Sequence, residues 1–114
     1  MIIGTLKEKK KFENRVAISP DEVKSYLKSG HQVLIEKGAG SLSGFTDKSY
    51  KEAGATITNS KEVLKTSEII IKINCPSPEE SKLINNKAMV VSQISTKNNQ
   101  ESIKILNSRK VSAF

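Results

Sequence analysis

The sequence has little of the side-chain chemistry from which most active sites are built. It contains no tryptophan, one cysteine (Cys75) and one histidine (His31), and aromatic residues make up 4% of it. A single cysteine excludes an internal disulfide, which is compatible with a reducing compartment. No pair of carboxylates, cluster of metal ligands or Ser/His/Asp order is visible. The sequence therefore predicts no catalytic residue and no metal site.

Long apolar runs are also absent. The longest candidate, residues 69–73, is interrupted by Lys72 and is far shorter than the roughly 20 residues that a membrane-spanning helix needs. Residues 1–4 run directly into a strand pattern, so no secretory signal is predicted. We expect a cytoplasmic location.

Arginine is scarce although the chain is basic. The net charge is +7, but only Arg15 and Arg109 are arginines, and the one tight basic cluster is residues 7–11. Nucleic-acid binders favour arginine because its planar fork recognises phosphates and base edges. We therefore favour compositional bias over nucleic-acid binding, with the charge serving solubility or attraction to an anionic partner.

Strand and helix signals alternate along the 114 residues, a length that suits one domain. Two segments carry the signature of a helix start: Ser19-Pro20 with Glu22, and Ser77-Pro78 with Glu80. Strands are predicted at residues 2–6, 32–36, 55–58, 68–73, 88–94 and 110–114. Helices are predicted from residue 20 to Gly30, over 47–53, from Asn59 or Ser60 to 65, after Ser77, and from Asn98 or Asn99 to about 108.

This alternation predicts right-handed βαβ crossovers and a parallel sheet. The fold class is α/β, a Rossmann-like or flavodoxin-like doubly wound sheet over a single domain, residues 1–114. The last strand pattern runs to Phe114 without a polar tail. We expect the domain to be incomplete relative to a larger unit.

A glycine-rich loop, residues 37–44, invites comparison with the dinucleotide-binding fingerprint. The fingerprint follows the first strand, but this loop follows the second, and its third glycine, Gly44, comes one residue late. Asn59 and Ser60 stand where an acidic ribose ligand would be expected. We interpret the loop as a turn and predict no cofactor-binding residue.

Arg15 and Lys72 are the candidate site residues. Arg15 lies in the loop after the first strand, where parallel sheets bind ligands, and its guanidinium could grip a carboxylate or phosphate. Alternatively, it forms a structural pair with Glu13 or Glu22. Lys72 lies within a buried strand pattern and would then need a partner, or else it faces an exposed edge. His31 follows a helix-ending glycine, and a solvent-exposed or capping role is favoured.

A set of motifs resembles the N-terminal domain shared by alanine dehydrogenase and the α subunit of proton-translocating NAD(P) transhydrogenase. The motifs occur in the family's order and cover essentially the whole chain. They are Glu13-Asn-Arg-Val-Ala-Ile-Ser-Pro20, Val23-Lys24, Gly30-His31, Val33-Leu-Ile-Glu-Lys-Gly-Ala-Gly40, Ser43-Gly-Phe45 and Tyr50-x-x-Ala-Gly-Ala55.

Two positions separate the two relatives. Asn74 stands where alanine dehydrogenases have the lysine that binds the keto acid, and residues 90–96 lack their catalytic histidine. At both positions, and in the segment 101–111, the sequence is similar to the transhydrogenase. Arg15 matches the arginine that holds the substrate carboxylate in alanine dehydrogenase. With Asn74 present and the histidine absent, Arg15 could instead order its loop.

The resemblance implies a role in hydride transfer from NADH to NADP⁺ coupled to proton translocation. It also implies NAD(H) and NADP(H) as cofactors of the complete enzyme. The family's main NAD(H) contacts come later in the sequence, so we expect neither cofactor to bind this chain alone. The expected partners are the rest of the α subunit and a membrane-bound, NADP(H)-binding β subunit, in an oligomer that lies at the inner membrane through them. Alternatives are an alanine dehydrogenase-type enzyme and a non-enzymatic basic module.

Overall fold

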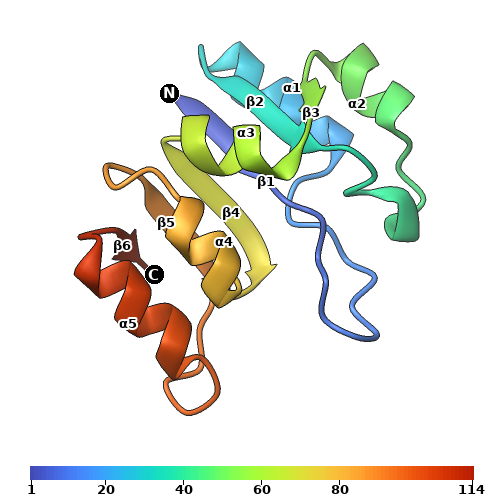
Figure 1. Ribbon diagram of the computed structural model, residues 1–114. Helices are drawn as coiled ribbons and strands as arrows, with labels where there is room; N and C mark the ends of the chain where they lie inside the picture. Colours follow the sequence, from blue (N-terminus) through green and yellow to red (C-terminus); the bar gives the residue numbers. More distant parts are fainter.

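A computed structural model describes all 114 residues. Six parallel strands form one sheet in the order β3-β2-β1-β4-β5-β6 (Figure 1). This is the Rossmann order, so the sequence prediction of a parallel doubly wound sheet is confirmed. The strands are β1 (Ile2–Thr5), β2 (Gln32–Glu36), β3 (Thr56–Thr58), β4 (Ile69–Asn74), β5 (Met89–Gln93) and β6 (Ser112–Ala113).

Five α-helices and one 3₁₀ turn connect the strands. Figure 1 shows α3, α4 and α5 on one side of the sheet, and α1 and α2 by β2 and β3. The helices are α1 (Pro20–Lys28), α2 (Asp47–Ala53), α3 (Ser60–Thr66), α4 (Pro78–Leu83) and α5 (Gln100–Ser108), with the turn η1 at Ser41–Ser43. None of these helices has the length and apolar character needed to span a bilayer.

The helix starts follow the predicted capping chemistry. Ser19 and Ser77 each accept a hydrogen bond from the third residue of their helix, and the backbone N–H of each cap donates to the side chain of Glu22 or Glu80. Asn59, the first of the two predicted caps, begins α3. Asn99 precedes α5, but its side chain accepts from the backbone of a residue in the preceding loop instead of capping the helix.

Two apolar clusters hold the helices to the sheet, one on each side. The first joins β1 and β2 to α1 and α2, and includes Ile3, Val23 and Tyr50. The second joins β4 and β5, together with Leu6 just after β1, to α3, α4 and α5, and includes Ile70 and Leu106. Because β1 lies between β2 and β4, the loop that follows it is anchored at the centre of the sheet.

Candidate functional site

The carboxyl ends of β1 and β4 meet at the middle of the sheet, where the direction of strand addition reverses. Ligands of doubly wound sheets bind in the crevice at such a reversal. In this protein the direct backbone pairing of β1 with β4 covers only Ile3 with Ile69 and Gly4 with Ile70. Beyond these pairs, the end of β4 needs other partners for its amides.

The side chain of Glu8 supplies those partners. Its two carboxylate oxygens accept hydrogen bonds from the backbone N–H groups of Ile73 (2.9 Å) and Asn74 (3.1 Å). Thr5 adds a hydrogen bond from its hydroxyl to the carbonyl of Ile71. A carboxylate thus takes the place of a neighbouring strand at the end of β4.

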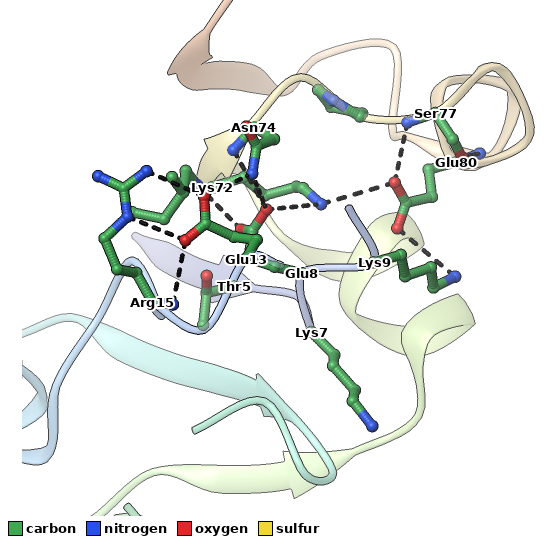
Figure 2. A network of polar contacts seen from close by, with 12 residues as sticks. Thr5, Lys7, Glu8, Lys9, Glu13, Arg15, Lys72, Asn74, Ser77 and Glu80 are labelled. Atoms are coloured by element: carbon green, nitrogen blue, oxygen red, sulfur yellow. Dashed lines mark hydrogen bonds and ion pairs between the residues drawn. The ribbon is translucent and has the colours of Figure 1, made fainter. Parts of the chain in front are cut away.

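Lys72 compensates this buried charge. Its Nζ lies 3.5 Å from Glu8 Oε1 and 3.7 Å from Glu80 Oε1, and its side chain is 3% exposed. Figure 2 shows Lys72 reaching between Glu8, from the loop after β1, and Glu80, from the first turn of α4. The alternative that Lys72 faces an exposed edge is therefore wrong. The second oxygen of Glu80 lies 3.8 Å from Nζ of Lys9.

Arg15 forms the structural pair with Glu13. Its Nε and Nη2 each lie 2.9 Å from an oxygen of Glu13, and its backbone N–H also donates to that carboxylate. The bidentate contact to Arg15, together with a hydrogen bond from Asn74, lowers the pKa of Glu13 to about 2. Glu22, the other proposed partner, is occupied with its helix cap. The Arg15 side chain remains 63% exposed, so it keeps donors for a further ligand.

Asn74 joins the two groups into one network. Its Nδ2 donates to Glu13 Oε1 at 3.0 Å and lies 3.4 Å from Glu8 Oε1 (Figure 2). Three carboxylates therefore face three cations: Glu8, Glu13 and Glu80 against Lys9, Lys72 and Arg15. The network orders the loop after β1, and its carboxylates are all hydrogen-bonded or ion-paired.

An open pocket of about 450 Å³ lies beside the network, at the carboxyl ends of β4 and β5. Amide and hydroxyl side chains dominate it, and Lys10 is its only cation. Its lining is Lys10, Asn74, Cys75, Gln93, Ile94, Ser95, Asn98 and Asn99. Burial raises the pKa of the Cys75 thiol, so Cys75 stays protonated at neutral pH and is a poor nucleophile.

The glycine loop does not present amides to a phosphate. Gly38 and Gly44 adopt positive φ, as turns require. Gly38 N–H donates to the side chain of Asp47, and the N–H groups of Ala39 and of most residues that follow donate within the loop. With these donors occupied, the loop leaves few free amides for a phosphate.

His31 lies away from the network. It is close to the chain's first residue, where the terminal amine lies 3.1 Å from its Nδ1, and its backbone N–H donates to the carbonyl of Tyr26 at the end of α1. No group of three His, Cys, Asp or Glu side chains could hold a metal ion. The structure therefore brings Lys72 and Arg15 into one network but leaves the single histidine outside it.

Sequence reasoning missed Glu8 and Glu80. Glu8 stands three residues after the end of β1, and only its pairing with residues 65 or more positions away reveals its role. The sequence correctly identified Glu80 as part of a helix cap, but the capping pattern does not reveal its ion pair with Lys72. A buried lysine on a strand was the one signal that carboxylates must lie nearby.

Comparison with known proteins shows which family the chain belongs to. A family model described as "Alanine dehydrogenase/PNT, N-terminal domain" matches residues 4–114. The chain is 50% identical over 84 residues to an alanine dehydrogenase of Methanococcus maripaludis, covering 73% of this chain and 22% of that protein. It is 38% identical over 114 residues to the NAD(P) transhydrogenase subunit alpha of Haemophilus influenzae, covering 100% of this chain and 22% of that protein.

A solved structure is similar over the whole chain. The transhydrogenase from Sinorhizobium meliloti superposes with a TM-score of 0.93 at 31% identity, covering 100% of this chain and 34% of that one. The chain thus spans between a fifth and about a third of the length of these relatives. Both enzyme names occur among the relatives, and alanine dehydrogenase is the more frequent. Because the family model matches residues 4–114, nearly the whole chain, the chain belongs to the alanine dehydrogenase/PNT N-terminal domain family.

Proposed function

We propose that this chain is the N-terminal part of the α subunit of a proton-translocating NAD(P) transhydrogenase. The complete enzyme would transfer hydride from NADH to NADP⁺ and would need NAD(H) and NADP(H). The chain alone would be inactive, since the family's NAD(H) contacts lie mostly outside these residues. Its partners would be the rest of the α subunit and a membrane-bound β subunit, in an oligomer at the inner membrane.

The observation that carries this proposal is the placement of Asn74. In alanine dehydrogenase, a lysine at this position would bind the keto acid. Here the neutral amide of Asn74 donates toward both Glu8 and Glu13, and so belongs to the structural network. The loop after β5 lines the adjoining pocket and contributes no histidine to it. The pocket therefore lacks both a second cation from β4 and a general acid–base group.

An alanine dehydrogenase-type enzyme is the second candidate. Arg15 favours it, because its side chain is 63% exposed and its guanidinium keeps N–H groups that could donate to a substrate carboxylate. The 50% identity to the M. maripaludis alanine dehydrogenase over 84 residues also favours it. Against it stand the missing lysine and histidine.

The first test is a calorimetric titration of NADH into the folded chain, for which we expect no heat of binding. The second domain of a transhydrogenase α subunit is then added, and NADH binding should be restored. The reconstituted enzyme, completed with its β subunit, should reduce an NADP⁺ analogue with NADH. Stoichiometric NADH binding to the chain alone would contradict the proposal.

The alanine dehydrogenase alternative has its own readout. Pyruvate- and ammonia-dependent oxidation of NADH by the reconstituted enzyme would establish it. In that case Asn74→Lys should raise the rate, because it would supply the keto-acid ligand. If the enzyme is a transhydrogenase, Asn74→Lys should produce no pyruvate-dependent oxidation.

A further inference from the structure

The loop after β1 turns its negative charges inward and its positive charges outward. Residues 7–13 contain four lysines and two glutamates. The carboxylate of Glu8 is buried against Lys72, and that of Glu13 is held by Arg15. All four lysines, by contrast, are exposed. The loop therefore presents mainly positive charge to its surroundings.

Phe12 stands at the tip of this loop. Its side chain is 88% exposed, more than any other large apolar side chain of the protein. The backbone N–H of Glu13 donates to the carbonyl of Lys10 (3.0 Å), which closes a tight turn, and Phe12 occupies the turn's third position with a φ of 69°. Glycine or asparagine is favoured there, and a bulky side chain is strained. Figure 1 shows the loop projecting away from the sheet.

Phe12 therefore strains its turn and contributes nothing to either apolar cluster. Strain that the core does not explain points to a contact outside the chain. Lys11 lies beside the ring, with its Nζ 5.2 Å from the ring centroid. The tip thus combines an exposed apolar ring with neighbouring ammonium groups on long, flexible stems. We call residues 9–12, Lys-Lys-Lys-Phe, the basic tip.

We propose that the basic tip binds the surface of an anionic lipid bilayer. The ring of Phe12 enters the boundary between headgroups and acyl chains, and the lysines lie among the lipid phosphates. Reversible binding of this kind needs both an apolar and a basic contribution, and the basic tip supplies both. The inference goes beyond the proposed function, in which partner chains hold the enzyme at the membrane.

The same side chains are a poor match for nucleic acid. The basic tip contains no arginine, although arginine provides the planar fork that recognises phosphates and base edges. It offers one aromatic ring, whereas single strands are bound by several rings on which successive bases stack. Lysine acts on phosphates as a point charge, which is sufficient for the headgroup layer of a bilayer.

The first test measures flotation of the folded chain with lipid vesicles. The chain should float with vesicles of phosphatidylcholine and phosphatidylglycerol but not with phosphatidylcholine alone, and added salt should weaken the binding. The double variant Lys10→Gln/Lys11→Gln should bind about 20-fold more weakly, because each lysine near an anionic surface strengthens binding about fivefold. The matched control, Lys61→Gln/Lys65→Gln, removes the same charge from exposed positions of α3 and should weaken binding less than about threefold.

Phe12→Asn separates a contact with lipid from a structural role. Asparagine tolerates the positive φ, so the urea midpoint of unfolding should rise. Binding to the anionic vesicles should nevertheless fall about 10-fold, because the apolar ring is lost. Phe114→Asn is the matched control: Phe114 is also exposed, lies after β6, and should not affect vesicle binding. A structural Phe12 would instead give a lower midpoint and unchanged binding.

Phe12→Trp provides a direct readout of position. The chain has no tryptophan, so this residue would be its only indole fluorophore. Its emission should shift to shorter wavelength on anionic vesicles and be quenched by lipids brominated in their acyl chains. No binding to anionic vesicles, or binding without this shift, would overturn the inference.

Two competitors distinguish the bilayer surface from other anions. Soluble glycerol phosphate at the concentration of the lipid should leave the chain on the vesicles, and displacement would show that phosphate alone is the ligand. Single-stranded RNA that binds more tightly than the vesicles and requires Phe12 would make nucleic acid the occupant. Either result would overturn the inference. All these measurements are made without NADH, so they do not depend on which reaction the complete enzyme catalyses.

Discussion

Among the residues of the site, Glu13 is the carboxylate whose ionisation is most clearly changed by its surroundings. Its pKa falls from 4.5 to about 2, first because the Arg15 side chain donates to it and then because Asn74 does. In the unfolded chain the carboxyl would regain its ordinary pKa. The contribution of Glu13 to the free energy of unfolding is therefore present above about pH 4.5 and is lost as the pH falls toward 2.

Urea denaturation at pH 5 and pH 3 checks this expectation. The wild type should lose more free energy of unfolding between the two pH values than Glu13→Gln does. Carboxyl NMR should show the Glu13 pKa rising in Arg15→Met, since this substitution removes the largest cause of the shift. A Glu13 that titrates near 4.5 in the intact chain would contradict the geometry of the pair.

Lys72 offers a prediction about stability. Lys72→Met would leave Glu8 and Glu80 with no buried cation between them. Removing one partner of a buried ionic group typically costs about 3–5 kcal/mol, so we expect the free energy of unfolding to fall by about 3 kcal/mol. Lys9→Met is the matched control. Lys9 is 62% exposed, and its contact with Glu80 should contribute less than about 1 kcal/mol.

Denaturant unfolding of both variants and of Lys72→Met/Glu8→Gln measures these differences. The double variant should lose less than the sum of its single changes, because Glu8→Gln removes one of the charges that Lys72 neutralises. Equal and small losses in Lys72→Met and Lys9→Met would show that the buried charge of Lys72 is not needed.

At the scale of elements, α4 shows how one side chain serves two purposes. Glu80 Oε1 accepts a hydrogen bond from Ser77 N–H (2.9 Å), which begins the helix, and it also lies near Lys72. The capping box therefore fixes both the start of α4 and the carboxylate that Lys72 needs. Because α4 begins next to the end of β4, its capping residue Glu80 also supplies a negative charge to the site.

Local signals explain which elements could be predicted from the sequence. The capping boxes at Ser19 and Ser77 act over three residues, so the sequence contains them in full, and both helices begin where predicted. The last strand, by contrast, is shorter than the predicted 110–114. β6 consists of Ser112–Ala113, which pair with Met89 and Val90 of β5. Its length depends on a neighbour that the strand pattern cannot reveal.

The candidate site was harder to predict than the fold because its contacts are long-range. Arg15 and Glu13 are two positions apart, and their pairing was one of the two proposed alternatives. Glu8 meets Ile73 and Asn74 across more than 60 residues, which requires knowledge of the strand order. Burial of Lys72 could be expected from its strand, but its partners could not be named.

At the scale of the whole molecule, the two halves of the sheet are unequally supported. β1 pairs with both β2 and β4, and Ile3 and the adjoining Leu6 belong to the first and the second apolar cluster. β6 pairs with β5 alone, and the face it shares with β5 is open. Local opening requires less free energy where fewer apolar contacts and fewer strand neighbours must be lost. The β5–α5–β6 part should therefore open more readily than the β1–β2 part.

Native-state hydrogen exchange tests this difference. The amide of Phe114, which donates to Val90, should exchange about 100-fold faster than amides in the β1–β2 pairing, once each is corrected for its intrinsic rate. If Phe114 and β1 exchange at the same corrected rate, the sheet opens as one cooperative unit.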